Sequence, residues 1–267
     1  MPMLAGYMVP HPPIAVHEIG RGEEKKIQPT LNSYDRVARH IAEIKPDTIV
    51  LVSPHSVCYG DYFHISPGAG ATGNFARFGV PSLSISVGYD TMLRDRICEL
   101  CLRDGVAAGT DYERDPYLDH GTLVPLYFIG KRYTDFKLIR IGLSGFSLRE
   151  HYHLGQLIQE ACDSSDERVV FVASGDLAHC QKEDGPYGYK PEGPEYDEKL
   201  MEVMGRAAFK ELLDFPGALL DECMECGHRS FCMIGGVFDG VPVRTEILSH
   251  EATFGVGYGF GIYEPLG

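Results

Sequence analysis

The sequence predicts a single α/β domain over residues 1–267, built on a central mixed, mostly parallel β-sheet flanked by helices. Short runs of β-branched and aromatic residues alternate with segments of helical periodicity, which is the pattern of α/β proteins. The chain is 44% hydrophobic and 23% charged, so it can bury one large core. No internal repeat, low-complexity tract or linker divides it, and we therefore expect one domain.

The first half of the chain contains strand-like runs that end near proline and segments whose apolar residues are three and four positions apart. Thr48–Val52 is rich in β-branched residues and is followed by Pro54, which predicts a buried strand. Glu23–Ile44 keeps the helical spacing from end to end. The glycine- and proline-rich stretch Ser66–Pro81 predicts a mobile loop. The other expected elements are strands at Met3–Val9, Tyr62–Ile65 and Leu83–Val87 and a helix at Thr91–Leu102.

The second half repeats this alternation. Val169–Ala173 is the strongest strand signal of the chain, and Gln181–Tyr196 is a polar segment that predicts a second long loop. Ala218–Phe238 has helical spacing, with Gly227 as a break. The remaining expected elements are strands at Lys137–Leu143, Val243–Leu248 and Phe254–Tyr263 and helices at Leu148–Cys162 and Lys199–Leu213.

Composition excludes several classes of protein. The net charge of -14 and the absence of a basic run argue against nucleic acid as a partner. No apolar stretch reaches the roughly 20 residues of a transmembrane helix, and the N-terminus lacks the features of a signal peptide. Eight cysteines in such a chain indicate reduced thiols, so we expect a cytoplasmic location. Two C-x-x-C pairs, at Cys98/Cys101 and Cys223/Cys226, are too far apart for a compact zinc ribbon, and core thiols are the simpler interpretation of the first pair.

Three histidines follow predicted strands. His11 comes after Met3–Val9, His55 after Thr48–Val52, and His179 after Val169–Ala173. Because ligands of α/β sheets bind outside the carboxyl ends of the strands, parallel strands would bring these imidazoles to one edge. His120 can join them from the stretch LDHGTLVPL, where the neighbouring Asp119 is a candidate to orient its ring. Together they predict a site at this edge of the sheet.

A metal at this edge would need an anionic ligand beside two imidazoles, the arrangement that suits Fe(II) or Mn(II). The segment MECGHRS offers a carboxylate, a thiol and a guanidinium in Glu225, Cys226 and Arg229. An exposed helix end is the alternative interpretation of that segment. A serine hydrolase built on Ser174 is disfavoured, because its surroundings lack the G-x-S-x-G turn.

The motifs VPHPP, SPHS, LDHGTLVPL and SGDLAH resemble, in this order, those of class III extradiol ring-cleavage dioxygenases of the protocatechuate-cleaving β-subunit type, in the branch related to Memo proteins. The resemblance spans nearly the whole chain and implies their α/β fold. It implies one divalent metal, Fe(II) or Mn(II), with Zn(II) as a further option. The implied residues are His11, His55 and Glu225 as metal ligands, with Cys226 as the alternative third ligand, His179 as general acid/base, His120, Asp119 and Asp176 as further catalytic residues, and Ser174, Arg229 and His228 in substrate binding.

The resemblance implies an enzyme that opens the ring of a small oxygenated cyclic substrate by cleaving a C–C bond. In the first version, a catechol-like compound is cleaved with O2 on non-haem Fe(II). In the alternative, a Mn-, Fe- or Zn-dependent hydrolase opens a cyclic 1,3-dione to an oxo-acid without O2, as dihydrophloroglucinol cyclohydrolase does. A Memo-like metal-binding role without turnover is the second alternative. We expect no nucleic acid or membrane partner, and the sequence leaves open whether the chain forms a homo-oligomer.

Overall fold

The central sheet has six strands in the order β7-β2-β8-β1-β10-β9, in a computed structural model that describes residues 3–266. The first four are parallel to one another, and β10 is antiparallel to both of its neighbours, β1 and β9. The expected α/β class, with a mixed and mostly parallel sheet, is confirmed. The strands are β7 (Lys137–Gly142), β2 (Thr48–Ser53), β8 (Val169–Ser174), β1 (Met3–Val9), β10 (Tyr258–Pro265) and β9 (Val243–Glu251).

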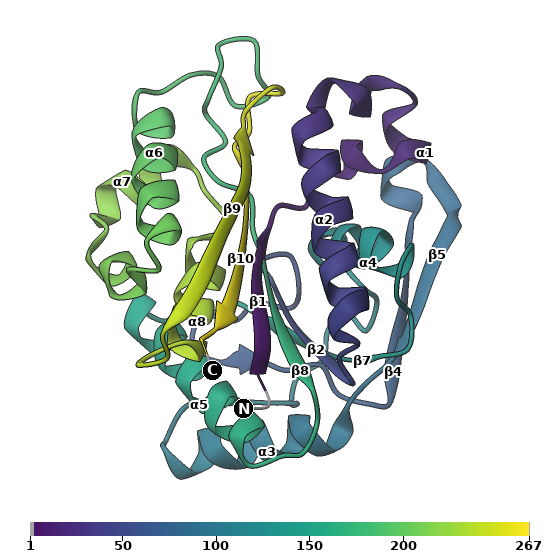
Figure 1. Ribbon diagram of the computed structural model, residues 1–267, viewed down its shortest axis with the longest axis vertical. Helices are drawn as coiled ribbons and strands as arrows, with labels where there is room; N and C mark the ends of the chain where they lie inside the picture. The colour runs from purple at the N-terminus through teal and green to yellow at the C-terminus, as the bar shows by residue number, and fades with distance from the viewer. Residues whose placement is uncertain (1–2, 267) are drawn as a thin grey trace.

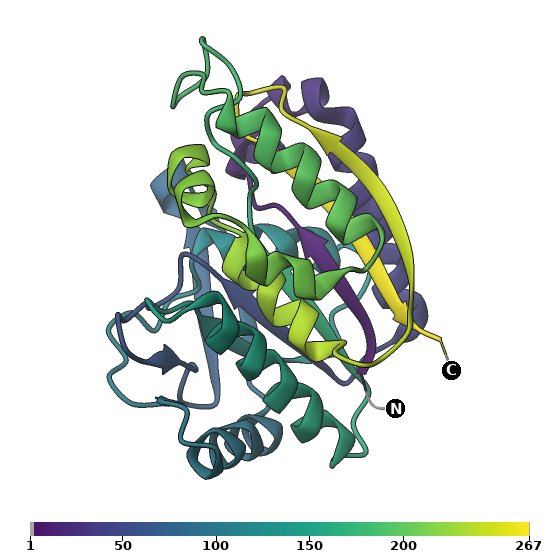
Figure 2. The ribbon, with the colours of Figure 1, turned by 90° about the vertical axis from the view of Figure 1, so that its left-hand side faces the viewer.

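Helices cover both faces of the sheet (Figure 1, Figure 2). Successive side chains of a strand point to opposite faces, so Ile49 and Leu51 of β2 join one core cluster and Val50 and Val52 join the other. Because both faces are buried, the parallel strands are continuous apolar runs. One face packs against α2 (Gln28–Ile44) and α4 (His120–Gly130), and the other against α3 (Thr91–Arg103), α5 (Leu148–Asp163), α6 (Glu192–Gly205) and α8 (His228–Val237).

The prediction of a mobile loop at Ser66–Pro81 is wrong, because most of this stretch forms the first strand and the tip of an antiparallel hairpin. Its glycines allow close packing: a Cβ on Gly73 would lie 2.6 Å from the carbonyl oxygen of Leu118. The hairpin therefore lies directly against the segment that leads into α4, a contact that local sequence does not reveal. Its elements are β4 (Gly70–Phe75), η3 (Ala76–Phe78) and β5 (Val80–Gly88), and a separate small sheet pairs β3 (Phe63–His64) with β6 (Ala108–Gly109).

The helical predictions need smaller changes. The chain from residue 218 to 238 forms two helices that are interrupted around Gly227, as expected. His120 lies at the first position of α4 rather than in a loop, because the Asp119 side chain caps that helix. The remaining elements are η1 (Pro13–Ala15), α1 (His17–Gly20), η2 (Glu23–Ile27), η4 (Phe209–Asp214) and α7 (Gly217–Cys223).

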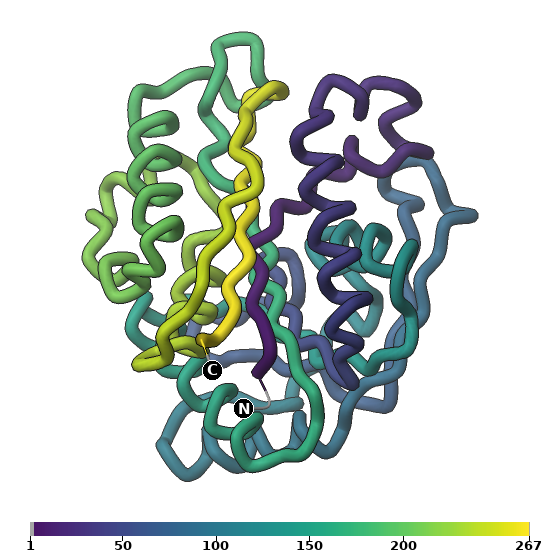
Figure 3. The backbone as a smooth tube through the Cα atoms, viewed as in Figure 1, coloured from purple at the N-terminus to yellow at the C-terminus, as the bar shows by residue number. Residues whose placement is uncertain are grey.

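The two ends of the described chain lie close together, at the end of the sheet where β1 begins and β10 ends (Figure 3). The parallel strands finish at the opposite end of the sheet, where the sequence predicts the site. Within residues 3–266, none of the helices has both the length and the apolar character that a membrane crossing needs.

Candidate metal centre and substrate cavity

Four histidines gather at the carboxyl edge of the parallel strands. The ring centroids of His11 and His55 are 4.8 Å apart, and the His120 ring stacks on His55 at 4.0 Å. His179 follows β8 and lies near enough for the charge of His55 to contribute to its lowered pKa. The strand-end positions therefore bring together side chains that are as much as 168 residues apart, from 11 to 179.

Three donor atoms have the spacing of a metal site. His11 Nε2 lies 3.0 Å from His55 Nε2 and 3.6 Å from Cys226 Sγ, and all three atoms are within 4.8 Å of one another. Tetrahedral coordination with ordinary metal–nitrogen and metal–sulfur bonds would give about 3.3 Å between two nitrogens and about 3.6 Å between nitrogen and sulfur. The donor set fits one divalent cation.

The hydrogen bonds of His11 leave the nitrogen that faces this site free to ligate. The Ser174 hydroxyl donates to the Gly121 carbonyl oxygen at 2.6 Å, so it accepts from His11 Nδ1–H at 2.9 Å. Nε2 then keeps its lone pair, as a metal-binding imidazole requires. Asp176 adds a second restraint by accepting the backbone N–H of His11 at 2.7 Å. Ser174 is fully buried and orients His11, so the predicted contact of Ser174 with substrate is not what its position provides.

The structure brings Cys226, rather than Glu225, to the two imidazoles. One carboxylate oxygen of Glu225 accepts the N–H of His228 at 2.6 Å at the start of α8. The Cys226 sulfur accepts the N–H of Asp176 at 3.3 Å, which fixes it beside His11. Burial raises the pKa of the Cys226 thiol, and a bound cation would oppose this by favouring the thiolate.

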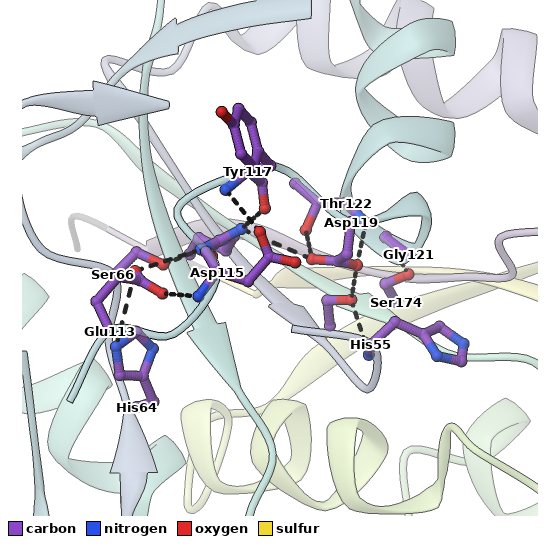
Figure 4. Close-up of polar contacts among 12 residues, drawn as sticks. His55, His64, Ser66, Glu113, Asp115, Tyr117, Asp119, Gly121, Thr122 and Ser174 are labelled. Carbon is purple, nitrogen blue, oxygen red and sulfur yellow. Dashed lines mark hydrogen bonds and ion pairs between the residues drawn. The ribbon is translucent and has the colours of Figure 1, made fainter. Parts of the chain in front are cut away.

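The Asp119 side chain caps the start of α4 and does not hydrogen-bond the ring of His120. It accepts hydrogen bonds from Ser53 Oγ at 2.5 Å and from the Thr122 N–H at 3.1 Å (Figure 4). The expected carboxylate–imidazole pair is therefore replaced by a helix cap. The His120 ring instead lies between His55 and Phe78, and burial lowers its pKa to about 4, so it is neutral at pH 7.

His179 has an unshared nitrogen within the site. Its Nε2 is buried and has no hydrogen-bond partner among residues 3–266. The ring of Tyr187, from the segment after β8, lies 5.1 Å away and helps to cover it. Burial lowers the pKa of His179 to about 4, so the imidazole is neutral and can accept a proton.

His228 lies in the core and not in the site. Its Nε2–H donates to the Leu212 carbonyl oxygen at 2.8 Å, and its Nδ1 accepts from the Tyr196 hydroxyl at 3.1 Å. Both ring nitrogens are thus used, and the side chain is fully buried, so the predicted substrate contact of His228 is wrong. Its neighbour Arg229 is partly buried, and within the described chain its Nε lacks a hydrogen-bond partner, so its role stays a prediction.

We expect His228 to make stability depend on pH. Burial lowers its pKa from the ordinary 6.5 to about 4, so only the unfolded chain takes up a proton as the pH falls through 6.5. The contribution of neutral His228 to the free energy of unfolding is therefore present above pH 6.5 and is lost towards pH 4. The loss amounts to about 2 kcal/mol between pH 7 and pH 5. Urea unfolding should show a smaller fall for His228→Gln than for the unchanged protein. His153, whose side chain is 40% exposed, is the control, and an equal fall in all three proteins would contradict the assignment.

A cavity of about 390 Å³ opens beside the imidazoles, within the range of small-molecule sites. His55, Asp119 and His120 form one wall. Residues 74 and 76–78 of the hairpin also line the cavity, and their part in the site was not predicted because this stretch was expected to be a loop. The other lining residues are Asn74, Ala76, Arg77, Phe78, Asp115, Tyr117, Leu118 and Leu123.

Arg140, whose side chain is 1% exposed, is a further residue of this region that was not predicted. It lies on β7 and lines a second cavity of about 220 Å³ that shares His55 and Asp119 with the first. Its guanidinium donates to Ser66 Oγ at 2.6 Å and to the Asp115 carbonyl oxygen at 3.1 Å (Figure 4). An arginine inside the apolar run KLIRIGL was the available signal, because a charge in a buried strand requires partners.

Known proteins resemble this chain over most of its length. The chain is 38% identical over 260 residues to Protein CA_C1420 of Clostridium acetobutylicum. The match covers 95% of this chain and 56% of that protein, so this chain spans little more than half the length of that relative. It is 25% identical over 292 residues to the 2-aminophenol 1,6-dioxygenase beta subunit of Pseudomonas sp, covering 96% of this chain and 92% of that one. The crystal structure of the uncharacterized protein JW3007 from Escherichia coli K12 shares the fold, with a TM-score of 0.64, 15% identity and coverage of 97% and 99%.

The family described as "Catalytic LigB subunit of aromatic ring-opening dioxygenase" matches residues 5–261, which is nearly the whole chain. The resemblance to class III extradiol ring-cleavage dioxygenases inferred from the four motifs is confirmed. The chain belongs to the LigB family of aromatic ring-opening dioxygenase catalytic subunits.

Proposed function

We propose that this chain is a metal-dependent enzyme that opens the ring of a small oxygenated cyclic substrate, as an extradiol dioxygenase-type enzyme on a catechol-like compound. The observation that supports this best is the meeting of His11 Nε2, His55 Nε2 and Cys226 Sγ beside a 390 Å³ cavity. Membership of the LigB family supports the same class of reaction.

In this proposal, His11, His55 and Cys226 hold one divalent metal. Fe(II), Mn(II) or Zn(II) bound there would supply a Lewis acid for substrate oxygens, and Fe(II) would also supply O2 chemistry. The chain's own residues do the remaining work. His179 takes a proton from the substrate at its free Nε2, and the neutral His120 ring faces the cavity to stabilise charge that develops on an oxygen.

Cys226 favours a second candidate, the O2-independent hydrolytic opening of a cyclic 1,3-dione. A thiolate beside the reacting oxygens is open to oxidation through sulfenic to sulfinic acid, which is unfavourable for sustained O2 chemistry. Hydrolysis needs the same cation, base and anion-stabilising group but no oxidant.

The deciding experiment is anaerobic purification and metal analysis, followed by incubation with catechol, 3,4-dihydroxybenzoate and cyclohexane-1,3-dione, with and without O2. Opening of a diol that stops when O2 is removed supports the dioxygenase. Opening of the dione under strict anoxia supports the hydrolase. Full metal without turnover of any of the three would overturn the proposed enzyme and favour a Memo-like role in metal binding.

We expect His179→Ala to retain metal and melting temperature while turnover of whichever substrate is opened falls by about 10² or more, because the proton acceptor is lost. Metal analysis and steady-state kinetics test this together. Tyr187→Phe is the control, since it keeps the ring that covers His179. Turnover in His179→Ala within twofold of the unchanged protein would remove the base assignment.

A further inference from the structure

His11 lies in a proline-rich segment that leaves the sheet. β1 ends at Val9, whose carbonyl oxygen accepts the N–H of Gly175 at 2.9 Å, and residues 10–13 have the sequence Pro-His-Pro-Pro. Proline has no N–H, so this segment has a single backbone donor, the N–H of His11. A ladder of strand hydrogen bonds therefore cannot hold the segment, and His11 needs support from side chains.

Two side chains hold the peptide unit that joins Pro10 to His11. Its N–H donates to Asp176 Oδ1 at 2.7 Å, and its carbonyl oxygen accepts from the Tyr34 hydroxyl at 2.5 Å. Pro10 and His11 are both buried, so these polar groups need partners within the protein. Because a peptide unit is planar and rigid, fixing both of its edges also fixes the backbone of His11.

Tyr34 is itself held firmly. It lies on α2 and is 2% exposed. Its ring stacks on Phe128 of α4, with centroids 3.9 Å apart and an interplanar angle of 8°, and meets Phe260 of β10 edge to face at 4.8 Å. A ring packed on a face and an edge has little freedom to turn, so its hydroxyl stays directed at the Pro10 carbonyl.

The placement of His11 matters because its two ring nitrogens have different partners. Nδ1–H donates to Ser174 Oγ at 2.9 Å, whereas Nε2 lies 3.0 Å from His55 Nε2 and 3.6 Å from Cys226 Sγ. Movement of the His11 backbone would carry Nε2 away from the other two donor atoms. Loss of a residue that orients a ligand typically weakens metal binding by about 10–100-fold.

Resting on the proposed metal site, we propose that Tyr34 is a positioning residue for the metal. Its hydroxyl holds the Pro10 carbonyl and thereby keeps His11 Nε2 in the place where it can ligate. Tyr34 supplies no ligand atom: its effect reaches the metal through one peptide unit and the His11 ring. Through it, α2 contributes to a site whose three ligands come from other parts of the chain.

The test measures the affinity of the metal-free protein for Zn(II), by anaerobic competition with a chromophoric chelator. Tyr34→Phe keeps the ring against Phe128 and Phe260 and removes only the hydroxyl. We expect the Zn(II) affinity of Tyr34→Phe to fall about tenfold, the lower end of the range for a residue that orients a ligand.

Tyr7→Phe is the matched control. Tyr7 is also fully buried, and its hydroxyl hydrogen-bonds to His40 Nδ1 at 2.9 Å instead of to the Pro10 peptide. Tyr7→Phe should bind Zn(II) within about twofold of the unchanged protein. If Tyr34 merely filled the core, both variants would lower the urea midpoint of the metal-free protein and neither would change Zn(II) affinity, which would overturn the proposal.

The Nδ1 proton of His11 gives a second measurement that needs no metal. In the metal-free protein it is shared with Ser174 Oγ, and nitrogen-15 NMR follows its exchange with solvent. We expect faster exchange in Tyr34→Phe and unchanged exchange in Tyr7→Phe. Tight Zn(II) binding that is equal in Tyr34→Phe and the unchanged protein would overturn the role of Tyr34 alone. Failure of the unchanged protein to bind Zn(II) would overturn the proposed metal site as well.

Discussion

Cys226→Ala is expected to purify with almost no metal, whereas Glu225→Gln is expected to retain it. The reason is geometric: Cys226 Sγ lies 3.6 Å from His11 Nε2, while the Glu225 carboxylate is engaged by the backbone of α8. Loss of one of three protein ligands should cost more than the 10–100-fold in affinity that is typical of a supporting residue. Elemental analysis after anaerobic purification and dialysis against a chelator measures this directly.

Two further variants extend this comparison of metal retention. His11→Ala should lose metal as Cys226→Ala does, and Ser174→Ala should retain metal more weakly, since it removes the acceptor that fixes the His11 tautomer. Glutamine at 225 keeps an oxygen for the His228 N–H, so the cap of α8 survives. Metal retained by Cys226→Ala and lost by Glu225→Gln would instead establish a two-histidine, one-carboxylate site.

Arg140→Met is expected to lower the free energy of unfolding by about 3–5 kcal/mol, the usual cost of removing one partner from a buried ionic network. Glu113 lies 3.6 Å and Asp119 3.9 Å from its guanidinium, and both carboxylates would lose their positive partner. The chain from residue 113 to 119 would lose its anchor to β7, so KM should rise because that segment lines both cavities.

Urea unfolding followed by circular dichroism measures this loss of stability. Arg39→Met is the control, because its ion pair with Asp35 is exposed and should change stability by about 0.5 kcal/mol or less. A change of that size in Arg140→Met would show that Arg140 is not the anchor of this segment.

Much of the fold was predictable because burial on both faces makes the parallel strands continuous apolar runs. The same regularity predicted the meeting of His11, His55 and His179, since each follows a strand and parallel strands end at one edge. The glycine-rich strand β4 was not predictable, because contact with Leu118 selects it and propensity does not, whereas its partner β5 contains the strand predicted at Leu83–Val87.

The roles of site residues that are close together in the sequence were harder to predict. Glu225, Cys226 and His228 lie within four positions, yet one caps a helix, one faces the imidazoles and one is buried in the core. Contacts distant in sequence decide this: the Cys226 sulfur accepts the N–H of Asp176, and a Cβ on Gly175 would lie 2.2 Å from the Gly227 Cα, so the two backbones lie in close contact. Composition and periodicity do not contain that information.

The position of β1 between β8 and β10 has a consequence for how the protein is made. Among the described strands β1 is made first, and it pairs with strands that are completed more than 160 and 250 residues later, at Ser174 and Pro265. Until then its N–H and C=O groups lack their partners, and the two halves of the site are separate pieces of chain. Closing such long loops is slow, so the nascent chain exposes the apolar edges of β1 at least until β8 has been made. The cation site proposed for His11 and Cys226 can form only after Cys226 has been made, 215 residues after His11.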